Sequence, residues 1–156
     1  MYAEACYRGD VSEEHIGKRL YACADAKISD FNLLELPNLP VDGEIGGNYE
    51  MNPIRYLPFQ DILLGLYDKH IVENKFSEHY KKLIPMYENA ISENQKWAYI
   101  FEFMLELVKF LQYKCDIGIK LKKAYDEHNI EELNKLLLQL YVLKDCCENF
   151  HNKLRR

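Results

Sequence analysis

The sequence lacks the patterns that mark strands, membrane spans and secretion signals. No stretch alternates β-branched and polar residues over the length of a strand, so no sheet is expected. Glu102, Glu106 and Lys109 interrupt the longest apolar stretch, which excludes a membrane-spanning helix. The first residues, "MYAEACYRGD", lack the apolar segment of a signal peptide. These absences predict a cytoplasmic protein with no membrane partner.

Excess positive charge and paired cysteines are also missing. The net charge is −5, and the only basic run is "NKLRR" at the end of the chain, so a nucleic-acid partner is not expected. None of the cysteines forms a C-x-x-C pair, which argues against a disulfide framework and against zinc. They are expected to be reduced thiols that serve as small apolar residues. The cysteines are Cys6, Cys23, Cys115, Cys146 and Cys147.

Motifs that carry chemistry are absent as well. The histidines are scattered without metal-binding spacing, and no G-x-S-x-G nucleophile motif occurs. The glycines of "DGEIGGNYE" lack the lysine of a phosphate loop. Asp126 and Glu127 are adjacent acids at a predicted helix end, where a solvated turn is the better interpretation. No catalytic residue, metal ligand or cofactor is therefore expected in this chain.

What is present is helical periodicity, which is weaker in the first half of the chain. A helix is expected after Asp10 or Ser12, with Ile16, Leu20 and Cys23 as its apolar stripe. A short segment is expected to be capped by Ser29 and to end before Pro37. The following residues, 37–53, are rich in proline and glycine and predict an irregular loop.

The second half predicts an antiparallel three-helix bundle. A first helix is expected over residues 73–91, with a kink at Pro85. "SENQ" (residues 92–95) and "NIEE" (residues 129–132) have the form of capping boxes and would open two further helices. Two apolar stripes between residues 97 and 125 predict that the middle helix is covered on two sides, and its aromatic residues are expected in the core. The last stripe is Leu133, Leu137, Leu140, Leu143, Cys147, Phe150 and Leu154.

One stretch, "NPIRYLPFQDILLGLYDKHI", does not read as a plain amphipathic helix. It resembles the segment that follows the catalytic barrel in a subgroup of family 20 glycoside hydrolases, the β-N-acetylhexosaminidases. Phe59 stands where the family usually has Trp or Tyr. The segments around residues 2–35 and 97–133 resemble the family's linker helix and the central helix of its C-terminal domain. The residues that fit the family's pattern are Asn52, Pro53, Arg55, Leu57, Asp61, Leu64, Gly65, Tyr67 and Asp68.

The resemblance implies an all-α, non-catalytic domain cut from a longer enzyme. Residues 1–9 would end the last barrel helix, residues 10–72 would be linker helices and junction, and residues 73–156 would be a truncated bundle. The family's catalytic Asp–Glu pair lies in the barrel, so the isolated chain is expected to be inactive. Such enzymes remove terminal β-linked N-acetylhexosamine, with the substrate's acetamido oxygen as nucleophile. The expected partner is the parent's barrel, with possible self-association through exposed apolar surface.

The candidate substrate-binding or domain-junction residues all lie in this stretch: Asn52, Arg55, Gln60, Asp61 and Asp68. The polar side chains are expected to face across the junction while Ile62, Leu63 and Leu66 anchor into the bundle. A simpler interpretation is that Asp61 only caps a helix. The alternative for the whole chain is an independent helical module that binds a partner helix in an aromatic groove.

Overall fold

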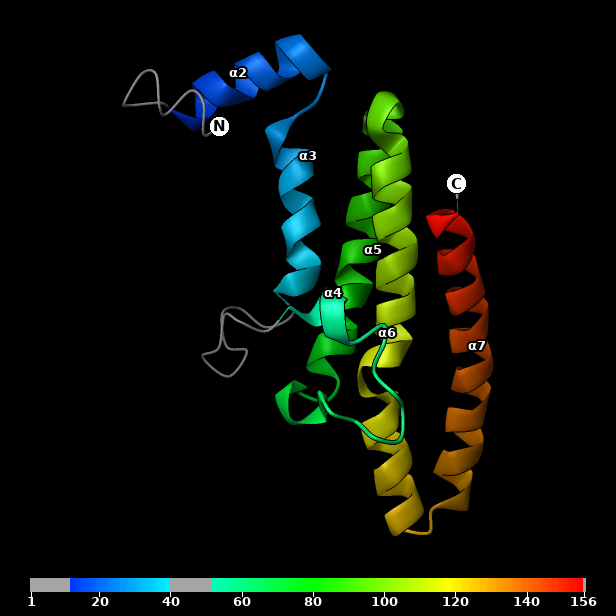
Figure 1. The fold of residues 1–156 in the computed structure, drawn as a ribbon. Helices are drawn as coiled ribbons and strands as arrows, with labels where there is room; N and C mark the ends of the chain where they lie inside the picture. The colour runs from blue at the N-terminus through cyan, green and yellow to red at the C-terminus, as the bar shows by residue number, and fades with distance from the viewer. Residues whose placement is uncertain (1–11, 40–51, 156) are drawn as a thin grey trace.

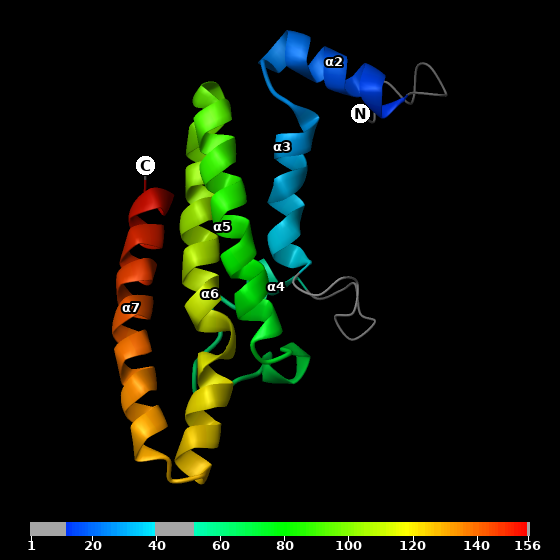
Figure 2. The same ribbon diagram turned by 180° about the vertical axis from the view of Figure 1, so that it is seen from behind.

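The structure is a computed structural model that describes residues 12–39 and 52–155, and it is all-α over those residues. Its main body is a layer of long antiparallel helices, α5 (Lys75–Glu93), α6 (Ala98–Asp126) and α7 (Ile130–Leu154). Both ribbon views place α6 between α5 and α7, as Figures 1 and 2 show. The prediction of a helical bundle with a long central helix is therefore confirmed.

Helix α6 is central because both of its apolar stripes are covered. Phe101, Val108 and Leu111 are fully buried, and Cys115 and Ile117 are almost so. Helix α5 meets it with a row spaced by alternating steps of four and three residues, the spacing that places side chains on one helix face. That row is Phe76, Tyr80, Leu83, Tyr87 and Ala90.

Helix α7 packs on α6 with part of the predicted stripe, since Leu133, Leu140, Leu143 and Phe150 lie in or against the core. Leu136 and Leu143 are its buried residues, whereas Leu137, Cys147 and Leu154 of the predicted stripe are exposed. The expectation for those three was wrong. The outer face of α7 carries a second apolar group, because Leu137, Leu138 and Tyr141 point away from α6 with exposures of 49%, 67% and 62%. Two apolar faces on one helix made the inward one ambiguous in sequence.

Two short helices, α3 (Ile28–Asn32) and the 3₁₀ helix η1 (Leu33–Asn38), lie along α5 on the side away from α7 (Figure 1). We call residues 28–38 the strap. Side chains of α5 hold its backbone: the Tyr87 hydroxyl donates to the Leu33 carbonyl at 2.7 Å, and His79 Nε2 donates to the Leu36 carbonyl at 2.8 Å. These two carbonyls of the strap thereby gain partners on α5.

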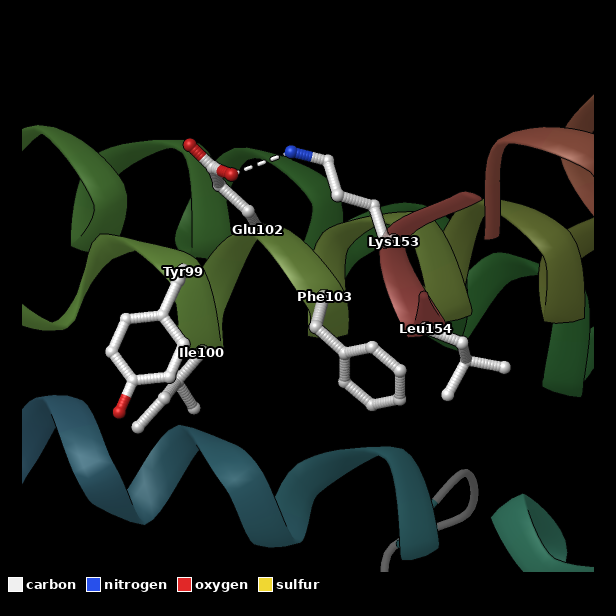
Figure 3. A pocket seen from close by; sticks show the side chains of 6 residues that line it. All are labelled: Tyr99, Ile100, Glu102, Phe103, Lys153 and Leu154. Atoms are coloured by element: carbon white, nitrogen blue, oxygen red, sulfur yellow. Dashed lines mark hydrogen bonds and ion pairs between the residues drawn. The ribbon is translucent and has the colours of Figure 1, made fainter. Parts of the chain in front are cut away.

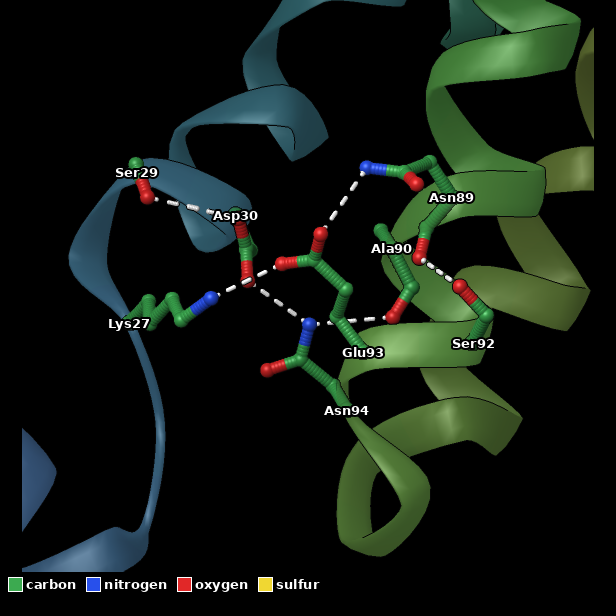
Figure 4. A network of polar contacts seen from close by, with 8 residues as sticks. All are labelled: Lys27, Ser29, Asp30, Asn89, Ala90, Ser92, Glu93 and Asn94. Atoms are coloured by element: carbon green, nitrogen blue, oxygen red, sulfur yellow. Dashed lines mark hydrogen bonds and ion pairs between the residues drawn. The ribbon is translucent and has the colours of Figure 1, made fainter.

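A polar network fixes the upper end of the strap to the end of α5 (Figure 4). The amide of Asn94, which is buried, donates to Asp30 Oδ2 at 2.7 Å and to the Ala90 carbonyl at 2.9 Å. Lys27 Nζ lies 2.8 Å from Glu93 Oε2 in an exposed ion pair. The buried amide is the stronger element of the two, because an unpaired buried polar group costs more than a solvated ion pair contributes.

Several helix boundaries differ from those predicted. Ser92 lies inside α5 and donates to the Asn89 carbonyl, so the predicted capping box at residues 92–95 is wrong. Helix α6 begins instead after a 3₁₀ turn, η3 (Gln95–Trp97). Ser29 is inside α3, and Pro37 lies within η1 rather than after it. Two predicted caps are confirmed: Ser12 accepts from the His15 N–H, and Asn129 accepts from the Glu132 N–H.

Helix α2 (Glu13–Ala24) projects from the strap at one end of the molecule (Figure 1) and buries none of its own residues. Asp25 ends it in a left-handed conformation, and Trp97 Nε1 donates to the Ala24 carbonyl at 2.9 Å. Within the described residues, no helix is both long and apolar enough to cross a membrane.

Candidate functional site

The stretch singled out in the sequence forms a compact, irregular loop against α6, and it begins with a one-turn helix, α4 (Pro53–Tyr56). The Asn52 side chain accepts from the Arg55 N–H at 3.2 Å and caps this turn. Pro53 fills the first helical position, where its missing N–H is harmless. Leu57 follows and is fully buried, so it anchors the start of the loop in the core.

Gln60 closes the loop with three hydrogen bonds. Its side-chain oxygen accepts from the Tyr67 N–H, and its Nε2 donates to Asp68 Oδ1 at 2.9 Å. Its backbone carbonyl accepts from Lys114 Nζ of α6 at 2.6 Å. One glutamine thus joins both ends of the loop to each other and to the bundle.

Asp61 organises the turn at the tip of the loop. One carboxylate oxygen accepts from the N–H groups of Leu63 and Leu64, at 2.8 and 2.9 Å. These bonds favour the ionised form, so the pKa of Asp61 is lowered from its ordinary value. Gly65 then takes a positive φ of 57°, and a Cβ there would lie 2.0 Å from Asp68 Oδ2. The turn therefore requires glycine at this position.

The loop rests on one face of α6, which we call the seat: Lys114, Gly118 and Lys122. Their spacing of four residues places them in a row. Lys114 is buried, which lowers its pKa, and Lys122 Nζ lies 2.8 Å from Asp68 Oδ2. Between them, a Cβ at Gly118 would stand 2.3 Å from the Ile62 carbonyl oxygen. Glycine at this position therefore allows the backbone of the loop to touch the backbone of α6.

The outer side of the loop is apolar. We call this group the crest: Phe59, Leu63, Leu64 and Leu66, with exposed fractions of 85%, 71%, 72% and 82%. The expectation that Leu63 and Leu66 anchor into the bundle was wrong; of the three expected anchors, Ile62 packs against the core. The two leucines point outward instead of inward because polar side chains of the loop satisfy its irregular backbone.

The structure brings all five predicted site residues into this one loop. Asn52, Gln60, Asp61 and Asp68 make side-chain hydrogen bonds within it. Asn52, Arg55 and Asp61 are exposed, and the Arg55 guanidinium lies 5.8 Å from the Tyr56 ring centroid. Sequence reasoning missed the seat residues. The signal available in the sequence was the spacing of four residues between two lysines and a glycine, which places them on one face of the predicted helix.

Two hollows lie away from the loop. One, of about 440 Å³, is an apolar groove near the start of α6, with the Glu102–Lys153 ion pair on its rim (Figure 3). Tyr99 lines it and is 62% exposed, so its expected place in the core was wrong. The other hollow is polar and lies near the α6–α7 turn, between Glu73 and Glu132. Among the described residues, no group of three or more His, Cys, Asp or Glu side chains is arranged to hold a metal ion.

The long central helix, the strap and the seated loop define a helical domain with one preformed irregular surface. The model of one protein family, described as the Glycoside Hydrolase 20C C-terminal domain, matches residues 29–156, and the chain belongs to this family. The match includes the strap from residue 29 onward, the loop and all three long helices, and it begins after α2. Comparison with the curated proteins and with the solved structures found no match.

Proposed function

We propose that this chain is the non-catalytic helical domain of a β-N-acetylhexosaminidase that removes terminal β-linked GlcNAc or GalNAc from glycans. The family supports this proposal, because its description names a C-terminal domain of a glycoside hydrolase. Catalysis then belongs to a barrel in the parent chain, and the helical domain supports it. Asp126 and Glu127, the adjacent acids of this chain, are exposed at the end of α6, as expected of a solvated turn.

In the proposed enzyme the loop at residues 52–68 forms the junction between the helical domain and the barrel. The observation that carries this step is the preformed shape of the loop, since Gln60, Asp61 and Asp68 fix it by side-chain hydrogen bonds and an ion pair. A surface fixed before contact loses little conformational entropy when it meets its partner. Asn52, Arg55 and Asp61 are polar residues of this loop that remain exposed.

We place the enzyme in the cytoplasm. The support is the state of the cysteines: Cys23, Cys115, Cys146 and Cys147 are all free thiols in the structure. Burial raises the pKa of the Cys115 thiol, which keeps it protonated and inert. Unpaired cysteines are typical of a reducing compartment.

The test is hydrolysis of a chromogenic β-N-acetylglucosaminide by two proteins, this chain alone and the same chain joined to its upstream barrel. We expect turnover only from the joined protein. Turnover by this chain alone that disappears in Asp126→Asn would transfer catalysis to the helical domain. A joined protein that cleaves neither N-acetylglucosaminide nor N-acetylgalactosaminide would remove the hexosaminidase assignment.

The exposed outer face of α7 favours a second candidate, a helical interaction module that associates with a partner helix or with itself. Leu138 and Tyr141 lie on this face, where an isolated domain would leave them in water. Sedimentation of the joined protein over a hundredfold concentration range separates the candidates. A monomer at all concentrations leaves only the domain-junction role, whereas a mass that rises with concentration and returns to the monomer in Leu138→Asp assigns α7 to self-association.

A further inference from the structure

The crest differs from an ordinary protein surface in the amount of apolar side chain that it exposes. Four large apolar side chains lie within eight residues, and each exposes more than two thirds of its surface. Single exposed apolar residues are common, but a contiguous group usually marks a contact surface. In a stable domain with a filled core, such a group needs an explanation other than poor packing.

The loop that carries the crest is fixed by contacts at both of its ends and with α6, so the crest has a defined position. Leu57 and Tyr67, at its two ends, are buried in the core. Lys114 and Lys122 bind it at Gln60 and Asp68, and Gly118 lets it lie directly on α6. The backbone of the loop therefore presents the crest at a fixed height above the bundle.

The chemistry of the crest indicates the chemistry of its partner. The only ionised side chain between Phe59 and Leu66 is Asp61; one of its carboxylate oxygens accepts from two backbone N–H groups, and the residue remains exposed. The amide of Gln60 is likewise used within the loop. The four side chains of the crest carry no charge, so the part of a partner surface that matches them is apolar.

We propose that the crest inserts into an apolar socket on the catalytic barrel of the same polypeptide, and that the seat residues on α6 set its position there. This inference rests on the proposed function, which supplies the barrel. The occupant follows from the family, since a C-terminal domain of a glycoside hydrolase is joined to a catalytic domain in one chain. The contact is thus made by the apolar side chains, and Gln60 and Asp68 act on it through the shape that they impose on the loop.

The test uses the joined enzyme and follows unfolding by calorimetry. Docked domains unfold together, whereas undocked domains unfold in separate transitions. We expect one transition for the wild type and two for the Leu63→Asp/Leu66→Asp double variant. The matched control is Leu138→Asp on α7, an equally exposed leucine away from the loop, which should keep one transition. Gly118→Ala, which moves the loop without changing the crest, should separate the transitions partly.

The outcomes distinguish the inference from the function on which it rests. Helix content measured by circular dichroism must be retained in each variant, and Phe59→Ser provides a milder second variant. If the double variant and Phe59→Ser both keep a single transition while the wild type hydrolyses the chromogenic substrate, the crest does not dock and only the inference is overturned. If no variant and no wild type turns over, the proposed function fails. A crest variant that changes only the concentration dependence of the sedimented mass assigns the crest to a second copy of the chain and also overturns the inference.

Discussion

The α5–α6 interface and the loop on the seat use the same kinds of side chain in opposite directions. Between the helices, apolar side chains such as Tyr80, Leu83 and Phe101 point inward and most charged ones face solvent. An exception is the buried carboxylate of Asp116, which accepts from the Asn74 N–H. In the loop, Gln60 and Asp68 point inward. The leucines of the crest, Leu63, Leu64 and Leu66, face outward. The difference arises from the backbone: a helix satisfies its own N–H and C=O groups, whereas an irregular loop needs side chains to do so. Polar side chains that face inward therefore indicate an irregular backbone. The apolar side chains of such a segment then face outward, where they are available for contact with a partner.

The strongest test of this comparison is a matched pair of phenylalanines. Phe101 is fully buried and packs edge-on against Phe31 of the strap, with ring centroids 5.5 Å apart, whereas Phe59 is 85% exposed. We expect Phe101→Ala to lower the free energy of unfolding by about 3–5 kcal/mol. Phe59→Ala should change it by less than about 0.5 kcal/mol. Urea denaturation measures both, and equal losses would mean that the crest is part of the core.

The glycines of the two regions give the next largest effect. Gly118→Ala places a methyl group against the Ile62 carbonyl, and we expect a cost of about 1–3 kcal/mol from overpacking. Gly17 is the control, because a Cβ there meets Ile28 Cγ2 at an ordinary 3.6 Å. Gly17→Ala should stabilise helix α2 by about 0.5–1 kcal/mol. Thermal unfolding of both variants decides the matter, and a stabilised Gly118→Ala would show that the loop can lift off α6 without cost.

The ion pair that joins the loop to the seat should contribute less. Lys122 and Asp68 form it with side chains that are 42% and 18% exposed, so solvent screens their attraction. In a double-mutant cycle with Lys122→Met and Asp68→Asn, we expect a coupling energy below about 1 kcal/mol. Both variants should keep their helix content by circular dichroism. A coupling several times larger would indicate that the pair is shielded from water more fully than its exposure implies.

The smallest effect should come from the titration of Asp61. Its pKa is lowered in the folded state, so ionised Asp61 stabilises the fold above its unfolded pKa, and this contribution is lost as the pH falls through the folded pKa. Between about pH 5 and pH 2, the melting temperature of the wild type should therefore fall more steeply than that of Asp61→Asn. Parallel curves for the two proteins would mean that the carboxylate gains nothing from the Leu63 and Leu64 N–H groups.

The regular helices were predictable because their apolar residues repeat with the helical period. The end of α6 and its two covered stripes followed from that repeat. The inward row of α7 followed only in part, since Leu136 and Leu137 are adjacent leucines and only the contact with α6 decides which is buried. The start of α6 was missed for a similar reason: Ser92 donates to a carbonyl of its own helix, which a capping motif in sequence cannot distinguish from a true cap.

The candidate site was located by its sequence, but its orientation was not. The residues of "NPIRYLPFQDILLGLYD" do lie together, and Asp61 does cap a turn. Which side chains face outward depended on tertiary partners more than 40 residues away, since Lys114 and Lys122 are each 54 residues from the groups that they bind. Contacts of that range leave no periodic pattern in the loop itself.

We expect the strap to be the last part of the fold to form. The three long helices follow one another in the chain, so each pairing closes only a short connection. The bonds that hold the strap and its leading residues join positions 43, 54 and 73 residues apart. Closing such long loops costs more chain entropy. This cost is offset by new contacts only when the surface that binds the strap has already formed. The hydroxyl of Tyr87, the ring of His79 and the indole of Trp97 are on that surface, so we expect the long helices to assemble before the strap docks on them.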